Sequence, residues 1–167
     1  MVVKTQQAPA DKKPAQKLSA HVLIIEARFY EAIADMLADG AVAECDTRGV
    51  TFERIVVPGA LEIPQVLAAA GAARAAGRFA FDGAIVLGCV IRGETAHYDI
   101  VCNNANHWTM DAASRHDVPV GNGILTVENE AQAIARAEGS IKGKGGDAAR
   151  ACLRLIELKR GFWDRGA

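Results

Sequence analysis

The sequence predicts an α/β fold in which a parallel sheet is covered by helices on both faces. Short apolar runs alternate four times with longer segments of helical composition, as in proteins built from strand–helix units. The runs lack polar alternation, which is typical of strands buried on both faces. With 167 residues, 50% of them hydrophobic, the chain is long enough to form one domain with a sizeable core.

The four predicted strands are the main apolar runs of the chain. They lie at residues 21–25, 54–57, 84–87 and 118–127. The second ends at Pro58-Gly59, a pair that stops a strand, and the third ends at Gly88. The fourth contains Gly121-Asn122-Gly123. Because a helix follows each strand, we expect all four strands to run in the same direction.

Five segments have helical composition. They lie at residues 31–44, 60–76, 97–115, 128–138 and 147–163. In the first segment Ile33, Met36 and Leu37 share one helical stripe. Pro64 fits the second segment only in its first turn, because proline breaks a helix interior. A loop rich in glycine and lysine, residues 139–146, joins the last two helices.

Composition excludes several classes of function. Lys plus Arg total 19 and Asp plus Glu total 20, so no basic field points to nucleic acid. The apolar runs are too short to span a membrane. We therefore expect neither a nucleic-acid partner nor a membrane partner. The nearly neutral net charge is compatible with self-association.

The cysteines and the N-terminal segment bear on localisation. The four cysteines are Cys45, Cys89, Cys102 and Cys152, and none forms a Cys-x-x-Cys pair. This spacing argues against a zinc site and predicts free thiols in a reducing compartment, the cytoplasm. Met1 to Lys17 is polar and lacks the apolar core of a signal peptide. We predict a disordered tail over residues 1–17 and one domain over residues 18–167.

The junction between the third strand and the next helix is the first candidate site. A glycine turn that opens a helix presents free backbone N–H groups and a positive dipole end, which suit an anion. We predict that Thr95 caps this helix and that His97 lies in its first turn. Each residue also has a plain structural interpretation, since His97 could be a surface or capping residue and Arg92 a solvated charge.

Ligands of parallel α/β sheets bind beyond the carboxyl ends of the strands. The segments expected at that edge are residues 28–30, 58–62, 88–97 and the region of residues 121–122. The loop at residues 139–146 fails the test for an ATP-binding loop, because Gly145 follows Lys144 where Ser or Thr is needed. Arg136 and Lys144 remain as sources of positive charge for a phosphate pocket.

Five motifs resemble those of lumazine synthases, from about His21 to Phe162. They are Glu26–Tyr30, Val57–Pro64, Gly88–Asp99, Gly123–Ala133 and Lys144–Ala149. The resemblance implies a three-layer α/β/α sandwich with a four-stranded parallel, flavodoxin-like sheet. It implies a cofactor- and metal-free transferase of riboflavin biosynthesis. Such an enzyme condenses 5-amino-6-(D-ribitylamino)uracil with 3,4-dihydroxy-2-butanone 4-phosphate to give 6,7-dimethyl-8-ribityllumazine, phosphate and water.

The resemblance also assigns roles at the phosphate end of the site. Backbone N–H groups of Glu94 and Thr95, together with Arg136, match the phosphate-binding positions. His97 matches the proton-transfer residue, and a helix N-terminus would keep its imidazole neutral near pH 7. Asp147 matches an acidic position that orients this histidine, and Lys144 matches a basic residue near the site.

Residues of three segments match the positions that hold the ribityl-uracil substrate. They are Phe29, Ala60, Leu61, Glu62, Cys89, Val90 and Ile91. Phe29 offers a flat face to the pyrimidine, and Glu62 can accept hydrogen bonds from ribityl hydroxyls. The alternatives are that Phe29 is a core residue and that Glu62 is an acid favoured by a helix dipole.

Two residues depart from the family pattern. Asn122 stands where many relatives have a phenylalanine that reaches into a neighbouring subunit's site, and Leu61 stands where an aromatic residue is common. Both changes reduce stacking area, so we expect weaker pyrimidine binding but no loss of the reaction.

The resemblance implies a homopentamer with active sites between subunits, and riboflavin synthase as a partner. Some relatives pack twelve pentamers into a hollow shell of 60 subunits, and the sequence leaves open whether the pentamers stop or continue. Two other functions compete with catalysis. One is a storage shell or flavin binder without turnover, and the other is a monomeric flavodoxin-like module that binds flavin phosphate.

Overall fold

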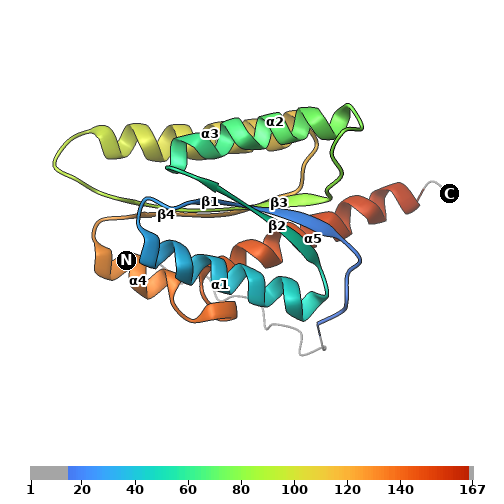
Figure 1. The fold of residues 1–167 in the computed structure, drawn as a ribbon, viewed down its shortest axis with the longest axis horizontal. Helices are drawn as coiled ribbons and strands as arrows, with labels where there is room; N and C mark the ends of the chain where they lie inside the picture. The colour runs from blue at the N-terminus through green and yellow to red at the C-terminus, as the bar shows by residue number, and fades with distance from the viewer. Residues whose placement is uncertain (1–14, 166–167) are drawn as a thin grey trace.

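The protein is a four-stranded parallel sheet between two layers of helices (Figure 1), seen in a computed structural model that describes residues 15–165. The strand order is β2-β1-β3-β4. The strands are β1 (His21–Ala27), β2 (Thr51–Val57), β3 (Gly83–Ile91) and β4 (Val120–Val127). The predicted α/β/α sandwich with a parallel, flavodoxin-like sheet is confirmed.

The helices divide between the two faces of the sheet (Figure 1). One layer contains α2 (Ile63–Ala75) and α3 (His97–Arg115). The other contains α1 (Glu31–Arg48), α4 (Glu130–Ala137) and α5 (Lys144–Asp164). Each crossover from one strand to the next parallel strand carries a helix, which is the usual way to join parallel neighbours.

The core consists of two apolar clusters, one on each side of the sheet. Alternate side chains of β1 point to opposite faces, so Val22 and Ile24 join the cluster under α1 and α5. Leu23 and Ile25 join the cluster under α2 and α3. All four side chains are fully buried. The continuous apolar run at the start of the chain is therefore a central strand, as its pattern predicts.

Helix boundaries differ from the prediction at several ends, and α1 continues to Arg48, four residues beyond the predicted Glu44. A 3-10 turn, η1 (Ala60–Glu62), precedes α2, and Pro64 lies in the first turn of α2 as predicted. A second 3-10 turn, η2 (Ser140–Lys142), occupies the loop before α5. Helix α5 begins at Lys144, three residues earlier than the predicted Asp147. The sequence does not predict this first turn, because Gly145 and Gly146 are poor helix formers.

Residues 1–14 of the predicted tail lie outside the described part of the chain. Residues 15–17 have no secondary structure, and Lys17 donates a hydrogen bond from Nζ to the carbonyl of Thr47 at 3.0 Å. Across the described range, no helix has the length and apolar character needed to cross a membrane. The four cysteines carry free thiols.

Glycine allows the start of α5 to touch the backbone of α1. A Cβ atom added to Gly145 would lie 1.8 Å from the carbonyl oxygen of Leu37. A Cβ atom on Gly40 of α1 would lie 2.9 Å from the backbone nitrogen of Gly146 in α5. Both distances are below van der Waals contact, so no side chain fits between the two helices at this level.

We predict opposite effects of two glycine-to-alanine substitutions in α5. Gly145→Ala would force the backbones of α1 and α5 apart and lower the free energy of unfolding by about 2 kcal/mol or more. Gly161→Ala meets no atom within 4 Å and gains helix propensity, so it would raise that free energy by up to about 1 kcal/mol. Urea unfolding at one fixed protein concentration measures both. Equal effects would contradict the close contact.

Candidate active site at the carboxyl edge of the sheet

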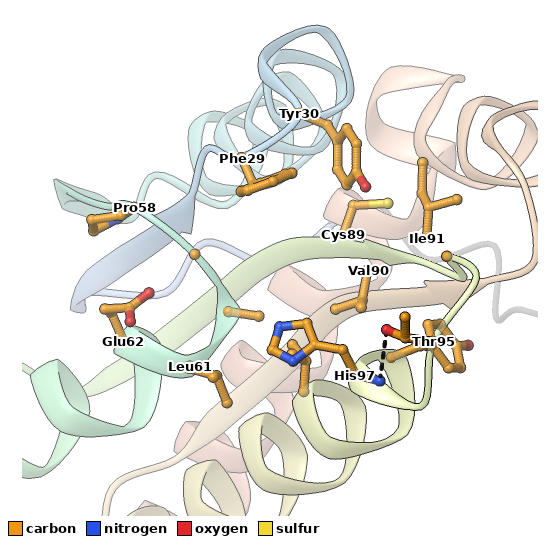
Figure 2. Close-up of a pocket in the computed structure, with 15 residues that line it drawn as sticks. Phe29, Tyr30, Pro58, Leu61, Glu62, Cys89, Val90, Ile91, Thr95 and His97 are labelled. Atoms are coloured by element: carbon orange, nitrogen blue, oxygen red, sulfur yellow. Dashed lines mark hydrogen bonds between the residues drawn. The ribbon is translucent and has the colours of Figure 1, made fainter.

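A cavity of about 430 Å³ opens where β1, β2 and β3 end (Figure 2). Its walls come from four segments that are distant in the sequence: residues 29–30, 58–62, 89–91 and 93–101. The first two segments follow β1 and β2, and the other two lie on either side of the β3–α3 junction. A ligand site at this edge is what the parallel topology predicts.

Aromatic rings form the wall that follows β1. The rings of Phe29 and Tyr30 lie 5.0 Å apart at an interplanar angle of 71°. Phe29 is 72% exposed in the single chain and lines the cavity, so it is not a core residue. An exposed ring at a cavity mouth can stack on a flat ligand.

A buried carboxylate fixes the base of this wall. Glu26, the second-last residue of β1, is 1% exposed and receives hydrogen bonds from Arg54 at 2.5 and 2.9 Å. Arg28 bonds Glu26 at 3.1 Å and Asp35 at 2.5 Å. The two arginines neutralise a charge that would otherwise be costly to bury. They also tie β1 to β2 and to α1 just before Phe29.

The end of β3 supplies the cavity floor. Cys89, Val90 and Ile91 line it, with Cys89 8% exposed. Burial raises the pKa of the Cys89 thiol to about 11. The thiol is therefore protonated at neutral pH and serves as an apolar surface rather than as a nucleophile.

The turn between β3 and α3 carries the exposed polar groups of the cavity. The Oγ1 atom of Thr95 accepts a hydrogen bond from the backbone N–H of His97 at 3.4 Å (Figure 2). The N-cap position belongs to Ala96, so the predicted capping position is wrong by one residue. The Thr95 hydroxyl still accepts a hydrogen bond from one backbone N–H group in the first turn of α3. Both Thr95 and His97 are exposed to the cavity.

Glu62 brings a carboxylate to the opposite side of the cavity. It ends the 3-10 turn η1 and is partly buried. Among the described residues its side chain has no ion-pair partner. Its oxygens remain available to accept hydrogen bonds from a ligand. Ala60 and Leu61 of the same turn line the cavity beside it.

The structure brings nine of the fourteen predicted site residues into this one cavity. They are Phe29, Ala60, Leu61, Glu62, Cys89, Val90, Ile91, Thr95 and His97. Glu94 is exposed in the same turn but does not line the cavity. The other four lie on β4, α4 and α5, outside the cavity of the same chain.

Those four residues have partners of their own or face solvent. Asn122 donates a hydrogen bond to Asn106 of α3 at 2.7 Å and accepts one from the backbone N–H of Ile124 at 2.9 Å. Asp147 pairs with Arg150 at 2.5 Å rather than with His97. Within one chain, Asn122 does not extend toward the cavity and Asp147 does not orient the histidine.

The two predicted basic residues, Arg136 and Lys144, lie on α4 and α5, in the helical layer on the face of the sheet opposite α3. Arg136 is exposed in the last turn of α4 and bonds its own helix at the Gln132 carbonyl, at 3.2 Å. Lys144 is exposed at the first position of α5. Residues 15–165 hold no group of three or more His, Cys, Asp or Glu side chains that could bind a metal ion.

Comparisons with known proteins agree on one family. The model of the family described as 6,7-dimethyl-8-ribityllumazine synthase matches residues 19–160. The chain belongs to this family. The resemblance of the five sequence motifs is thereby confirmed.

Curated relatives cover most of this chain and of their own length. The 6,7-dimethyl-8-ribityllumazine synthase of Agrobacterium fabrum is 51% identical over 140 residues, which are 84% of this chain and 95% of the relative. Those of Nitrobacter hamburgensis and Rhizobium meliloti are 49% and 51% identical and also cover 84% of this chain. The matches cover 86% and 92% of these two relatives. All three synthases therefore match this chain over nearly a whole domain.

Six residues that line the cavity were not singled out as site residues. They are Tyr30, Pro58, Gly59, Gly93, Tyr98 and Val101. The first four lie in segments that the sequence predicts at this edge of the sheet, and Val101 follows His97 by one helical turn. Helical spacing could have found Val101, because positions i and i+4 share a helix face. Tyr98 had no such signal, since its contacts depend on the fold.

Proposed function

We propose that this protein condenses 5-amino-6-(D-ribitylamino)uracil with 3,4-dihydroxy-2-butanone 4-phosphate in the cavity at the carboxyl edge of the sheet. One amine of the uracil condenses with the ketone to an imine with loss of water, phosphate is eliminated, and ring closure by the second amine releases a second water. The observation that carries this proposal is the cavity itself. It combines an exposed aromatic ring, an unpaired carboxylate and a histidine at a helix start, in a chain of the 6,7-dimethyl-8-ribityllumazine synthase family.

The uracil substrate occupies the side of the cavity formed by Phe29 and Glu62. The exposed face of Phe29 stacks on the pyrimidine, and the Glu62 carboxylate accepts hydrogen bonds from ribityl hydroxyls. The apolar floor from Cys89 to Ile91 excludes water beneath the ring. A protonated Cys89 thiol is suited to this passive role.

The phosphate of the second substrate occupies the turn before α3. We assign the binding to the N–H groups of Glu94 and Thr95, which precede the N-cap residue Ala96 and lie near the positive end of the α3 dipole. The Glu94 carboxylate would repel a phosphate, so we assign only its main chain to the binding. His97 lies beside this point and transfers the protons that the amine and the departing groups require.

Within residues 15–165 of one chain, no lysine or arginine lines the cavity, while Glu62 adds negative charge. A bound phosphate therefore needs a cation from elsewhere. We propose that Arg136 and Lys144 of a neighbouring copy complete the site, with Asp147 of that copy orienting His97. Exposed side chains such as Phe162 and Trp163, 65% and 77% exposed, support assembly of several copies.

We propose a homopentamer as the assembled state, with the site repeated at each interface. The four free cysteines favour a reducing compartment, and we assign the protein to the cytoplasm. Riboflavin synthase, which consumes the product, is the proposed partner. A monomeric yellow protein would instead favour the flavodoxin-like binding module.

The synthesis assay on wild type and His97→Ala tests the function. Purified wild-type protein mixed with both substrates should produce the fluorescence of the lumazine product. His97→Ala should lower kcat about a hundredfold or more, because proton transfer contributes that much to such reactions. Full activity of the variant would remove His97 from the mechanism, and an inactive wild type would contradict the proposed reaction.

Mixed assemblies test whether the site is shared between copies. His97→Ala and Arg136→Ala alone should both be weakly active. Co-expressed in equal amounts, they should regain activity at about a quarter of the sites, those that combine a native His97 with a neighbour's native Arg136. Co-expression of His97→Ala with His97→Gln is the control and should regain nothing. No recovery in the first mixture would place both residues in one chain's site.

Asn122→Phe should lower the KM for the uracil substrate. The phenylalanine adds stacking area at a position that we propose to face the neighbouring site. The lost Asn122–Asn106 hydrogen bond should cost only about 1 kcal/mol of stability. Asn106→Ala, which breaks the same bond without adding a ring, is the matched control. An unchanged or higher KM for Asn122→Phe would count against the stacking role.

A further inference from the structure

We propose that Arg92 is a positioning residue. Its contacts form a clamp that holds both ends of the phosphate-binding turn in place. This inference rests on the proposed function, in which the turn before α3 binds the phosphate group. The clamp consists of Arg92, Tyr98, Asp99 and Glu128, and it joins three elements around the turn. The guanidinium of Arg92 is already paired with two carboxylates, so we assign it a positioning role rather than a contact with the phosphate.

Arg92 holds the turn from the strand side. It directly follows β3, and its backbone N–H donates to the Val127 carbonyl at 2.9 Å, which extends the β3–β4 pairing by one residue. Its Nε atom donates to Glu128, just beyond β4, at 2.8 Å. The first residue of the turn is thereby tied to the neighbouring strand through both its main chain and its side chain.

The same guanidinium group holds the turn from the helix side. Its Cζ atom lies 4.1 Å from the centre of the Tyr98 ring, and its Nη2 atom lies 3.7 Å from Asp99. Both partners belong to the first turn of α3. The residues between these fixed points are those whose N–H groups are proposed to bind phosphate. Fixed ends reduce the number of conformations that the turn must lose on binding.

Arginine is the residue type that suits this geometry. Its planar group can stack on a ring with its face while its edge donates a hydrogen bond to one carboxylate and forms an ion pair with a second. The ammonium group of lysine is a point charge and cannot hold the same three partners at once. The two carboxylates also offset the charge of Arg92, which leaves little attraction for a substrate phosphate.

The effect of the clamp should be local. Arg92 is 40% exposed as a side chain, and its partners Asp99 and Glu128 are 58% and 57% exposed. Ion pairs this exposed contribute little to global stability. Loss of the clamp should therefore loosen the turn without unfolding the domain. The uracil side of the cavity, around Phe29 and Glu62, should remain unchanged.

Steady-state kinetics of Arg92→Met and Arg92→Lys test the role. Both variants should raise the KM for 3,4-dihydroxy-2-butanone 4-phosphate about tenfold, since misplaced binding groups lose affinity, while the KM for the uracil stays within about twofold. Arg115→Met breaks another exposed ion pair of α3, with Asp111, and should leave both values unchanged. Equal rises in both KM values, or a wild-type result for Arg92→Lys, would overturn the proposal.

A second measurement does not depend on activity. Hydrogen exchange at the hydrogen-bonded amides where the turn enters α3, those of His97, Asp99 and Ile100, should be faster in Arg92→Met than in wild type, while exchange in the β strands is unchanged. Unchanged exchange in the turn would overturn the clamp even if KM rises. If wild-type protein forms no lumazine, the proposed function fails, and the exchange result still decides whether Arg92 orders the turn.

Discussion

Parallel pairing of β1 with β2 and β3 brings the carboxyl ends of three strands to one edge of the sheet. The register pairs Glu26 with Val56 on one side and with Leu87 on the other. The segments that leave these strands must therefore begin close together, although they are distant in the sequence. Every wall of the cavity depends on this alignment. A sheet with one reversed strand would send one of these segments to the opposite edge.

Paired charges then hold the segments that leave the sheet. The buried Glu26 ties β1 to β2 through Arg54, and the more exposed Arg92 ties β3 to β4 and to α3. Between α1 and α5, Glu44 is 5% exposed and pairs with Arg150 at 3.1 Å. Arg150 also donates to the Ile141 carbonyl at 2.7 Å, which fixes the turn before α5. In all three places an arginine pairs with a carboxylate of another segment and joins two parts of the chain.

Apolar runs and motif order were sufficient to predict the strand–helix alternation and the group of residues at the sheet edge. They were insufficient wherever a contact joins residues distant in the sequence. The sequence around Arg92 does not indicate that Glu128 is its partner, because the two residues are 36 positions apart. From the sequence alone, Arg92 could therefore also be a charge that faces solvent. The start of α5 was missed because Gly145 has low helix propensity, which packing against Leu37 overrides. Asn122, Arg136 and Asp147 could not be placed relative to the cavity, because their proposed partners belong to another copy.

The backbone contact between Gly145 and Leu37 has a consequence for how the molecule opens. Because no side chain separates α1 from the start of α5, neither helix can shift alone without creating a clash or a gap. Transient opening of this region should therefore release α1, η2 and the first turns of α5 together. These segments form one cooperative unit of the native-state energy landscape, although almost a hundred residues of chain separate them.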